Sequence, residues 1–197
     1  MGDVDDAADP ACTTHCCVVD RHGTMVSLTQ TLLSPFGSKV ISPQTGILLN
    51  NGIMWFDPRP GRPNSIAPGR RPLSNMCPVI ASRDGAPWFA LGASGGRRIL
   101  PAVMQLASLL IDGGLDLESA FCVPRIDVSG GPAVLADRRL PPEISAALEA
   151  RFATRQVEHL VHPALFACPS AVLRDPATGE LLGMTEILHP AAGVAAV

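Results

Sequence analysis

The chain has 197 residues, a length typical of one domain, and 47% of them are hydrophobic, enough to bury a core. Charged residues make up only 17%, the formal net charge is -3, and the arginines are scattered, so a basic nucleic-acid-binding surface is not expected. No apolar run approaches the roughly 18 residues of a membrane span. The first residues are acidic and lack the basic and apolar parts of a signal peptide. We therefore expect a cytoplasmic chain, as it stands, with neither nucleic acid nor membrane as a partner.

The first predicted element is a β-hairpin over residues 13–31. Residues 20–23 form its turn, with glycine at the end, and residues 25–31 alternate apolar with polar side chains, as a half-buried strand does. The turn folds the second strand back beside the first.

Three segments follow the hairpin. We expect a loop over residues 34–45, a short apolar strand over residues 47–49, and an irregular stretch over residues 57–69. The last is so rich in proline and glycine that neither a helix nor a central strand can form there. A long irregular segment inside a compact domain is usually a functional or a disordered loop.

The second half of the chain predicts two more hairpins and three helices. Asp84 and Gly85 between apolar runs indicate a hairpin over residues 79–91. Apolar side chains at helical spacing, followed by two glycines, indicate a helix over residues 99–112. The other expected elements are helices over residues 117–121 and 142–153 and a hairpin that pairs residues 171–174 with 180–183. Strands at both ends that enclose helices predict an α+β or layered α/β fold.

Cysteine and histidine spacing gives no metal site. The six cysteines form no C-x-x-C pair, and Cys16 and Cys17 would point to opposite faces of a strand, so buried free thiols are expected. His159 and His162 are three residues apart and could share a helix face. No third ligand lies nearby, so surface or structural histidines are the favoured interpretation.

The hairpin begins on a threonine pair, Thr13 and Thr14. A threonine hydroxyl is a poor nucleophile unless a base takes its proton, and a free α-amine on the same residue, with a pKa near 8, is such a base. An N-terminal threonine can therefore do this chemistry by itself. The alternative is an ordinary Thr-Thr at a strand start, which β-propensity favours. Thr14 would point to the opposite face and is expected to be structural.

Four segments, residues 13–31, 46–51, 71–78 and 92–99, resemble in their order the small catalytic subunit of the γ-glutamyltransferase (glutathione hydrolase) family. The resemblance implies the αββα sandwich of N-terminal-nucleophile (Ntn) hydrolases, with this chain as one half. It implies residues 1–12 as a residual propeptide or large-subunit tail and residues 13–197 as the catalytic domain. A large subunit is the expected partner, and no cofactor is expected. If that subunit carries a signal, the location would be periplasmic.

The resemblance also implies catalytic roles. Thr13 matches the nucleophile, which becomes a new N-terminus when its hydroxyl attacks the preceding carbonyl and splits the Cys12–Thr13 bond. Thr31 matches the threonine whose hydroxyl supports the nucleophile, although an ordinary strand threonine is an equal alternative. Gly95 and Gly96 match the pair whose N–H groups form the oxyanion hole, with a plain turn as the alternative.

The expected substrate-binding residues depart from the family pattern. Ser74 matches the first of two serines that bind the substrate α-carboxylate, and Asn75 replaces the second but keeps an amide donor. Where the family binds the substrate ammonium through an asparagine, a glutamine and an aspartate, this chain has Leu33, Gly52 and Trp55. The indole removes a charge-assisted contact worth roughly 1.5 to 3 kcal/mol. Residues 53–56 are similar to the cephalosporin-acylase-like branch of the family.

Three functional hypotheses follow. The first is an autoprocessed threonine amidohydrolase or acyltransferase that cleaves γ-glutamyl or related acyl amides. The second is an acylase for glutaryl or cephalosporin-like amides. The third is an inactive fragment, because a chain that keeps residues 1–12 has a blocked threonine and no catalytic amine.

Overall fold

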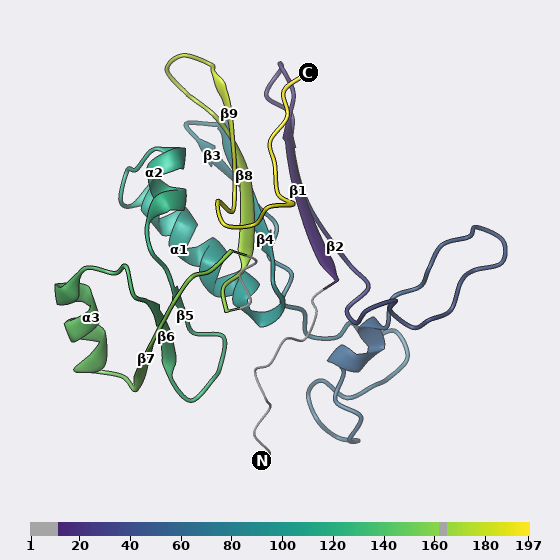
Figure 1. Cartoon of the computed structure of the whole chain (residues 1–197). Helices are drawn as coiled ribbons and strands as arrows, with labels where there is room; N and C mark the ends of the chain where they lie inside the picture. Colours follow the sequence, from purple (N-terminus) through teal and green to yellow (C-terminus); the bar gives the residue numbers. More distant parts are fainter. Residues whose placement is uncertain (1–11, 162–164) are drawn as a thin grey trace. The chain divides into compact units, whose positions relative to one another are not determined.

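The computed structural model describes residues 12–161 and 165–197, which form a mixed α+β fold (Figure 1). In chain order the elements are β1 (Thr13–Val19), β2 (Met25–Thr31), the 3₁₀ helix η1 (Gly52–Trp55), β3 (Val79–Arg83), β4 (Ala86–Ser94), the 3₁₀ helix η2 (Gly96–Arg98), α1 (Ile99–Ile111), α2 (Leu117–Cys122), β5 (Ile126–Asp127), β6 (Val134–Asp137), α3 (Pro142–Glu149), β7 (Thr154–Val157), β8 (Cys168–Arg174) and β9 (Leu181–Thr185). No helix in these two ranges is long and apolar enough to cross a membrane.

The chain divides into two compact units. The first comprises residues 1–14 and 30–75, and the second comprises residues 15–29 and 76–197. The β1–β2 hairpin has its open end in the first unit and its turn in the second. The predicted tail, residues 1–12, lies outside the described residues except for Cys12, so the predicted domain boundary stays a prediction.

The structure confirms the predicted first hairpin. At its turn the Gly23 N–H donates to the Asp20 carbonyl oxygen at 2.9 Å. The Asp20 carboxylate accepts from the N–H groups of His22 and Thr24, each at 2.8 Å. Exposed and half-buried side chains alternate along both strands, as the sequence predicts.

The core of the second unit lies between a four-stranded sheet, in the order β3-β4-β8-β9, and the helices α1 and α2, which cover one of its faces (Figure 1). Phe89 and Leu91 of β4 pack against Val103 and Leu106 of α1, and all four are at most 2% exposed. Burying a side chain of this size stabilises the fold by roughly 1.5 to 3 kcal/mol. The apolar spacing that predicts α1 is therefore the spacing of the core.

Two hairpins of this sheet have the predicted turns. Asp84 and Gly85 have φ angles of 53° and 80°, the left-handed values that a two-residue type I′ turn needs and that glycine and aspartate tolerate. β8 and β9 pair antiparallel with Arg174 opposite Leu181, as expected.

The structure differs from the expected elements in three places. Residues 47–49 do not form a strand, because only Leu48 makes an isolated bridge, with Ile41. The third helix ends at Glu149, four residues before its predicted end. A second sheet, β5-β6-β7, was not predicted. Its strands are two to four residues long, too short for a period-2 pattern to show.

The cysteines and His159 also differ from expectation. The described cysteines are free, but none is fully buried: Cys16 and Cys122 are exposed and the others are half-buried. Cys16 and Cys17 do lie on opposite faces. His159 follows β7 and lies on no helix, and its side chain is only 4% exposed. Of the two expected alternatives, a surface or a structural histidine, its burial between Asp137 and Glu186 supports the structural one, and His162 lies outside the described residues.

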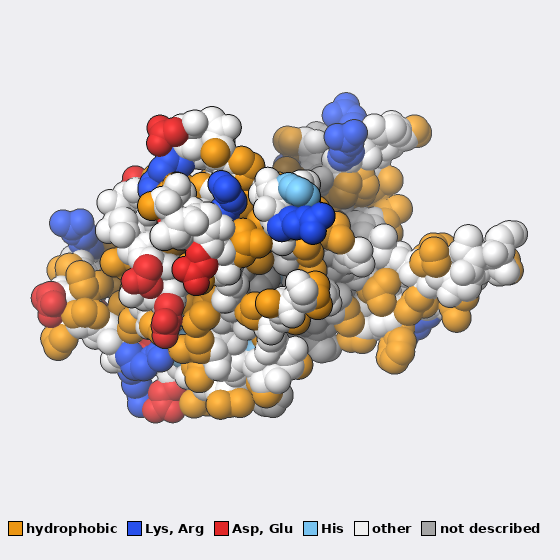
Figure 2. Space-filling model, turned by 90° about the horizontal axis from the view of Figure 1, so that it is seen from above, with side chains coloured by type: hydrophobic (Ala, Val, Ile, Leu, Met, Phe, Trp, Pro, Cys, Tyr) orange, Lys and Arg blue, Asp and Glu red, His pale blue; other side chains and the backbone are white. Residues whose placement is uncertain are grey.

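Apolar side chains are spread over the surface among few charged ones (Figure 2). Exposed apolar side chains of the second unit include Val18, Val26 and Leu28 on the outer face of the hairpin and Leu100, Met104 and Ile111 on α1.

Candidate active site

Two threonines meet at the open end of the first hairpin. Thr13 begins β1 and Thr31 ends β2, and their Oγ1 atoms lie 3.0 Å apart, at hydrogen-bond distance. The Thr31 hydroxyl also accepts from the Leu33 N–H at 2.9 Å. It can still donate its own hydrogen to Thr13 or accept from it. Among the described residues, Thr31 is the side chain that fixes the Thr13 hydroxyl.

The Thr13 hydroxyl has no acid–base partner among the described side chains other than this second hydroxyl. A neutral hydroxyl does not deprotonate another one at neutral pH, so nucleophilic chemistry needs a separate base. The α-amine of Thr13 is such a base only when it is free, because an amide nitrogen bonded to Cys12 is not basic. Turnover of a substrate at Thr13 therefore requires that the bond before it is cleaved first.

The chain just after Thr31 is held by an asparagine whose role the sequence did not predict. Asn51 accepts from the Ser34 N–H at 3.1 Å and donates to the Ser34 hydroxyl at 2.9 Å. Its own N–H donates to the Leu32 carbonyl at 3.1 Å. These bonds enclose Leu33, whose φ of 72° is uncommon for leucine. The only indication of this role in the sequence is that Asn51 lies in residues 46–51, one of the segments that resemble the family.

The Trp55 ring lies beside Gly52. A Cβ on Gly52 would be in ordinary contact with this ring, at 3.4 Å, and tight against the Asn50 side-chain oxygen, at 3.0 Å. The two departures at positions 52 and 55 are therefore neighbours in space. This wall is apolar and carries no charge for an ammonium group.

The expected carboxylate-binding pair lies in the same unit as Trp55. The Asn64 side chain donates to the Trp55 carbonyl at 2.6 Å and accepts from the Leu73 N–H at 3.0 Å, so it joins the two segments. Ser74 is exposed. Asn75 is half-buried, and its side-chain oxygen has no hydrogen-bond partner among the described residues.

The glycine pair lies in the second unit, where β4 leads into α1. Gly95 has a φ of 131° and Gly96 a φ of 61°, both in the region that favours glycine. A Cβ on Gly95 would lie 2.8 Å from the Ala167 Cα, so no other residue fits there. Backbone N–H groups before a helix are the type of donor that stabilises an oxyanion.

The inner face of the hairpin carries a polar contact that sequence analysis missed. His15 Nδ1 lies 2.8 Å from the Thr29 hydroxyl and Nε2 lies 3.1 Å from the Cys17 Sγ atom. Burial lowers the pKa of His15 and raises the pKa of the Cys17 thiol to about 11. A thiol that stays protonated is not a nucleophile, so this pair is structural.

The His15 ring also explains Gly92 of β4. A Cβ there would lie only 2.1 Å from the His15 Cε1 atom. Ser27 adds a second link, because its hydroxyl donates to the Leu91 carbonyl at 3.0 Å. The hairpin thus packs on the face of the sheet opposite α1. Within residues 12–161 and 165–197 no group of three or more His, Cys, Asp or Glu side chains could hold a metal ion.

The layering of helices, sheet and hairpin, with a threonine at the start of the hairpin, is that of the Ntn-hydrolase class. The family model for gamma-glutamyltranspeptidase matches residues 2–195. The chain therefore belongs to the gamma-glutamyltranspeptidase family, as the sequence predicts.

Two curated relatives differ in their named activity. The chain is 42% identical over 143 residues to the acylase ACY 1 proenzyme of Pseudomonas sp. (strain V22), a match that covers 73% of this chain and 25% of the relative. It is 37% identical over 150 residues to the glutathione hydrolase proenzyme of Escherichia coli (strain K12), covering 71% of this chain and 26% of the relative. The chain thus spans about a quarter of the length of these relatives.

Two solved structures show the same fold. Cephalosporin acylase from Bacillus halodurans is 29% identical with a TM-score of 0.76, covering 89% of this chain and 32% of that chain. A highly active mutant of gamma-glutamyltranspeptidase from Pseudomonas nitroreducens, in which an aspartate replaces a tryptophan, is 27% identical with a TM-score of 0.73. That match covers 93% of this chain and 99% of that chain.

Proposed function

We propose that this chain is the catalytic part of an amide-cleaving enzyme that works through an acyl-enzyme on Thr13. The observation that carries the proposal is the 3.0 Å contact between the Thr13 and Thr31 hydroxyls at the start of the hairpin, in a chain of this family. A hydroxyl fixed in this way is ready to attack a carbonyl carbon once a base can take its proton.

The first step would create that base. The Thr13 hydroxyl attacks the carbonyl carbon of Cys12, and the bond from that carbon to the Thr13 nitrogen breaks. The hydroxyl proton passes to this nitrogen, and the acyl group remains on the Thr13 oxygen as an ester. Water then hydrolyses the ester, which leaves a carboxylate on Cys12 and a free amine on Thr13. The amine has an ordinary pKa near 8 and is basic enough to accept the hydroxyl proton.

In turnover the amine takes the proton of the Thr13 hydroxyl as the oxygen attacks the substrate amide. The Gly95 and Gly96 N–H groups are the proposed donors to the oxyanion of the tetrahedral intermediate. The amine then gives its proton to the leaving nitrogen, and an ester remains on Thr13. Water or an acceptor amine removes the acyl group in the second half-reaction.

For the acyl group we propose one that bears a carboxylate but needs no α-ammonium. Ser74 and Asn75 supply neutral donors for a carboxylate, whereas Leu33, Gly52 and Trp55 supply no negative charge. The γ-glutamyl reaction is the second candidate.

The test compares kcat/KM for a glutaryl amide and the matching γ-glutamyl amide, with Thr13→Ala as the blank. We expect the two values to agree within a few-fold. In a pocket that pairs the ammonium, its loss would cost on the order of 10-fold or more, at ~1.4 kcal/mol per decade. A strong preference for γ-glutamyl would instead establish the glutathione-hydrolase reaction.

The inactive-fragment hypothesis has its own test. Intact-mass measurement separates a chain that begins at Thr13 from one that keeps residues 1–12. Only the first has a catalytic amine. An uncleaved chain without activity, in the presence of its expected large subunit, would contradict the proposed mechanism.

We further propose that a large subunit covers the outer face of the hairpin. Val18, Val26 and Leu28 are each about half exposed on that face, an arrangement more typical of an interface than of a free strand pair. Expressed alone, the chain should aggregate or bind a hydrophobic dye. A monodisperse monomer with a sharp cooperative melt would contradict this.

A further inference from the structure

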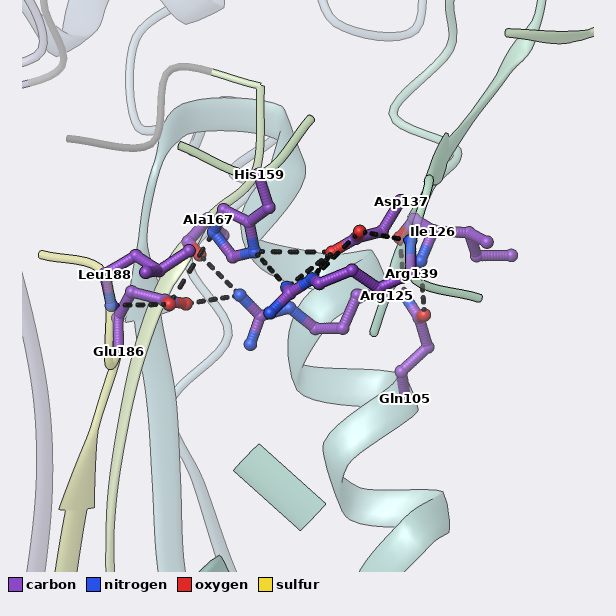
Figure 3. Close-up of polar contacts among 9 residues, drawn as sticks. All are labelled: Gln105, Arg125, Ile126, Asp137, Arg139, His159, Ala167, Glu186 and Leu188. Carbon is purple, nitrogen blue, oxygen red and sulfur yellow. Dashed lines mark hydrogen bonds and ion pairs between the residues drawn. The ribbon is translucent and has the colours of Figure 1, made fainter. Parts of the chain in front are cut away.

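A row of alternating charges is buried in the second unit (Figure 3). Arg139 pairs with Asp137 at 2.6 Å, His159 lies between Asp137 and Glu186 at 3.7 and 3.6 Å, and Glu186 pairs with Arg125. The side chains of Asp137, His159, Glu186 and Arg125 are at most 4% exposed, and only Arg139 reaches solvent. We call these five residues the charge row.

The charge row joins the two sheets of the unit. Asp137 ends β6 of the small sheet, whereas Glu186 directly follows β9 of the large one. Gln105 of α1 braces the same place, because its amide donates to the Ile126 carbonyl at 2.8 Å and accepts from the Ile126 N–H at 3.0 Å. The charge row and Gln105 therefore link the two sheets through polar contacts.

Stability alone is a weak reason for such an arrangement. Removing two charges from water is costly, and well-packed apolar residues of similar size often serve a fold as well or better. Charged groups do specify backbone positions, because a guanidinium has fixed donor directions. The role of Arg125 is therefore indicated by the backbone group that its guanidinium contacts.

Arg125 ends the row at the candidate oxyanion loop. Its Nη2 atom donates to Glu186 and also to the Ala167 carbonyl oxygen, at 3.3 Å. Ala167 is the residue against which Gly95 packs, at a distance that leaves no room for a Cβ. The backbone N–H of Glu186 also donates to the Pro169 carbonyl of β8, two residues after Ala167, at 2.9 Å.

We infer that Arg125 and Glu186 are positioning residues, which hold Ala167 so that the Gly95–Gly96 backbone is fixed where an oxyanion would form. The inference rests on the proposed function of the glycine pair. A neutral His159 leaves Glu186 paired with Arg125 and the row without net charge. Burial lowers the pKa of His159, which Glu186 and Asp137 oppose and Arg125 and Arg139 reinforce, so the neutral form is the one expected near pH 7.

The test is the double variant Arg125→Met with Glu186→Met, measured in the enzyme assembled with its large subunit. The two apolar side chains replace the ion pair without leaving a charge buried, so the protein should keep its melting temperature. We expect kcat to fall by roughly 10- to 100-fold with KM within about twofold, because aligned donors act mainly on the transition state. A purely structural pair would leave kcat unchanged once stability is kept.

A second variant covers the case in which the double variant does not fold. Arg125→Lys keeps a positive charge for Glu186 but has a shorter reach and no planar fork, so we expect a smaller loss of kcat, roughly threefold or more, again without a change in KM. If either variant folds and keeps the wild-type kcat, the inference is wrong. A rise in KM at constant kcat overturns it too.

The exposed pair Arg138–Glu158, at 2.7 Å, is the matched control. Replacing both of its residues by methionine should change neither kcat nor KM. The Thr13→Ala enzyme separates the two proposals. If that enzyme keeps its activity, the proposed function fails, whereas a wild-type kcat in the charge-row variants of an active, Thr13-dependent enzyme means that only the positioning role fails.

Discussion

The two units of the chain differ in how many apolar side chains they bury. The second unit contains every fully buried large apolar side chain among the described residues, from Trp88 to Leu173. In the described part of the first unit only Gly37 is buried, and its single helical element is a 3₁₀ turn. Yet the first unit holds Thr13, Thr31 and the expected binding residues. The comparison teaches that the packed unit supplies the scaffold, while the expected binding residues lie on loops that hydrogen bonds hold in place.

The segment that holds the expected binding residues also differs in charge from the rest of the chain. Residues 30–75 carry five basic residues and one acidic residue, a net charge of +4, whereas the whole chain carries -3. The remaining residues therefore carry -7. Asp57 in this segment already pairs with Arg59 at 2.7 Å, and that contact holds its pKa near 2. A net positive binding segment attracts anionic substrates, in agreement with an acyl group that bears a carboxylate.

The largest expected effect is the difference in activity between replacing Thr13 and replacing Thr14, the two threonines at the start of the hairpin. Thr13→Ala should stop both cleavage after Cys12 and turnover, a loss of about a thousandfold or more, because it removes the nucleophile. Thr14→Ala is the matched control, since that side chain is exposed on the opposite face. Intact mass and amide hydrolysis measure the two reactions. Cleavage in the Thr13→Ala protein would disprove the assignment.

The rigidity of the second unit can be tested at Gly92. In the enzyme assembled with its large subunit, Gly92→Ala would place a Cβ 2.1 Å from the His15 Cε1 atom and should destabilise the fold by about 2 kcal/mol, or roughly 5 °C in Tm. In Gly131→Ala the nearest atom is 3.8 Å away, so a thermal scan should find no change. Equal melting of both variants would show that the hairpin is not packed as described.

Substitutions of Trp55 test whether the substrate preference set by the first unit can be changed. Trp55→Asp should raise the ratio of γ-glutamyl to glutaryl kcat/KM by about tenfold, because a carboxylate can pair with the substrate ammonium. The highly active tryptophan-to-aspartate mutant among the solved relatives shows that such an exchange is tolerated in the family. Trp55→Ala removes the indole alone and should leave the ratio unchanged; an equal rise there would point to steric relief.

The smallest expected effect is a dependence of stability on pH. Burial holds the pKa of His159 below 6.5 in the folded chain, so below that pH the unfolded chain binds the proton first. Stability should therefore fall as the pH drops from about 7 towards 5. His159→Gln should flatten the decline of Tm over this window, and the slope that remains reflects His15, whose pKa burial also lowers. An unchanged slope would mean that His159 titrates normally.

The sequence predicts the elements that repeat a clear pattern. The hairpin turns at Asp20 and Asp84 and the apolar face of α1 are local features, and the structure confirms each of them. The sheet β5-β6-β7 could not be predicted because its strands are short and β6 pairs in parallel with β7 across α3. The contacts of Asn51, His15 and the charge row join residues distant in sequence, and no local pattern encodes them. The structure brings the Thr13 and Thr31 hydroxyls together, and the roles of all the site residues, these two included, stay predictions.

The backbone at Leu33 has a consequence for how specificity could change. Its left-handed conformation costs a leucine roughly 1 to 2 kcal/mol, whereas asparagine visits that region readily. Asparagine is also the residue that the family resemblance implies at this position for contact with the substrate ammonium. A Leu33→Asn change would therefore relieve backbone strain and add a polar group in one step. Of the three departures from the family pattern, the one at position 33 could therefore be reversed with a gain in stability, whereas the full recognition set also includes positions 52 and 55.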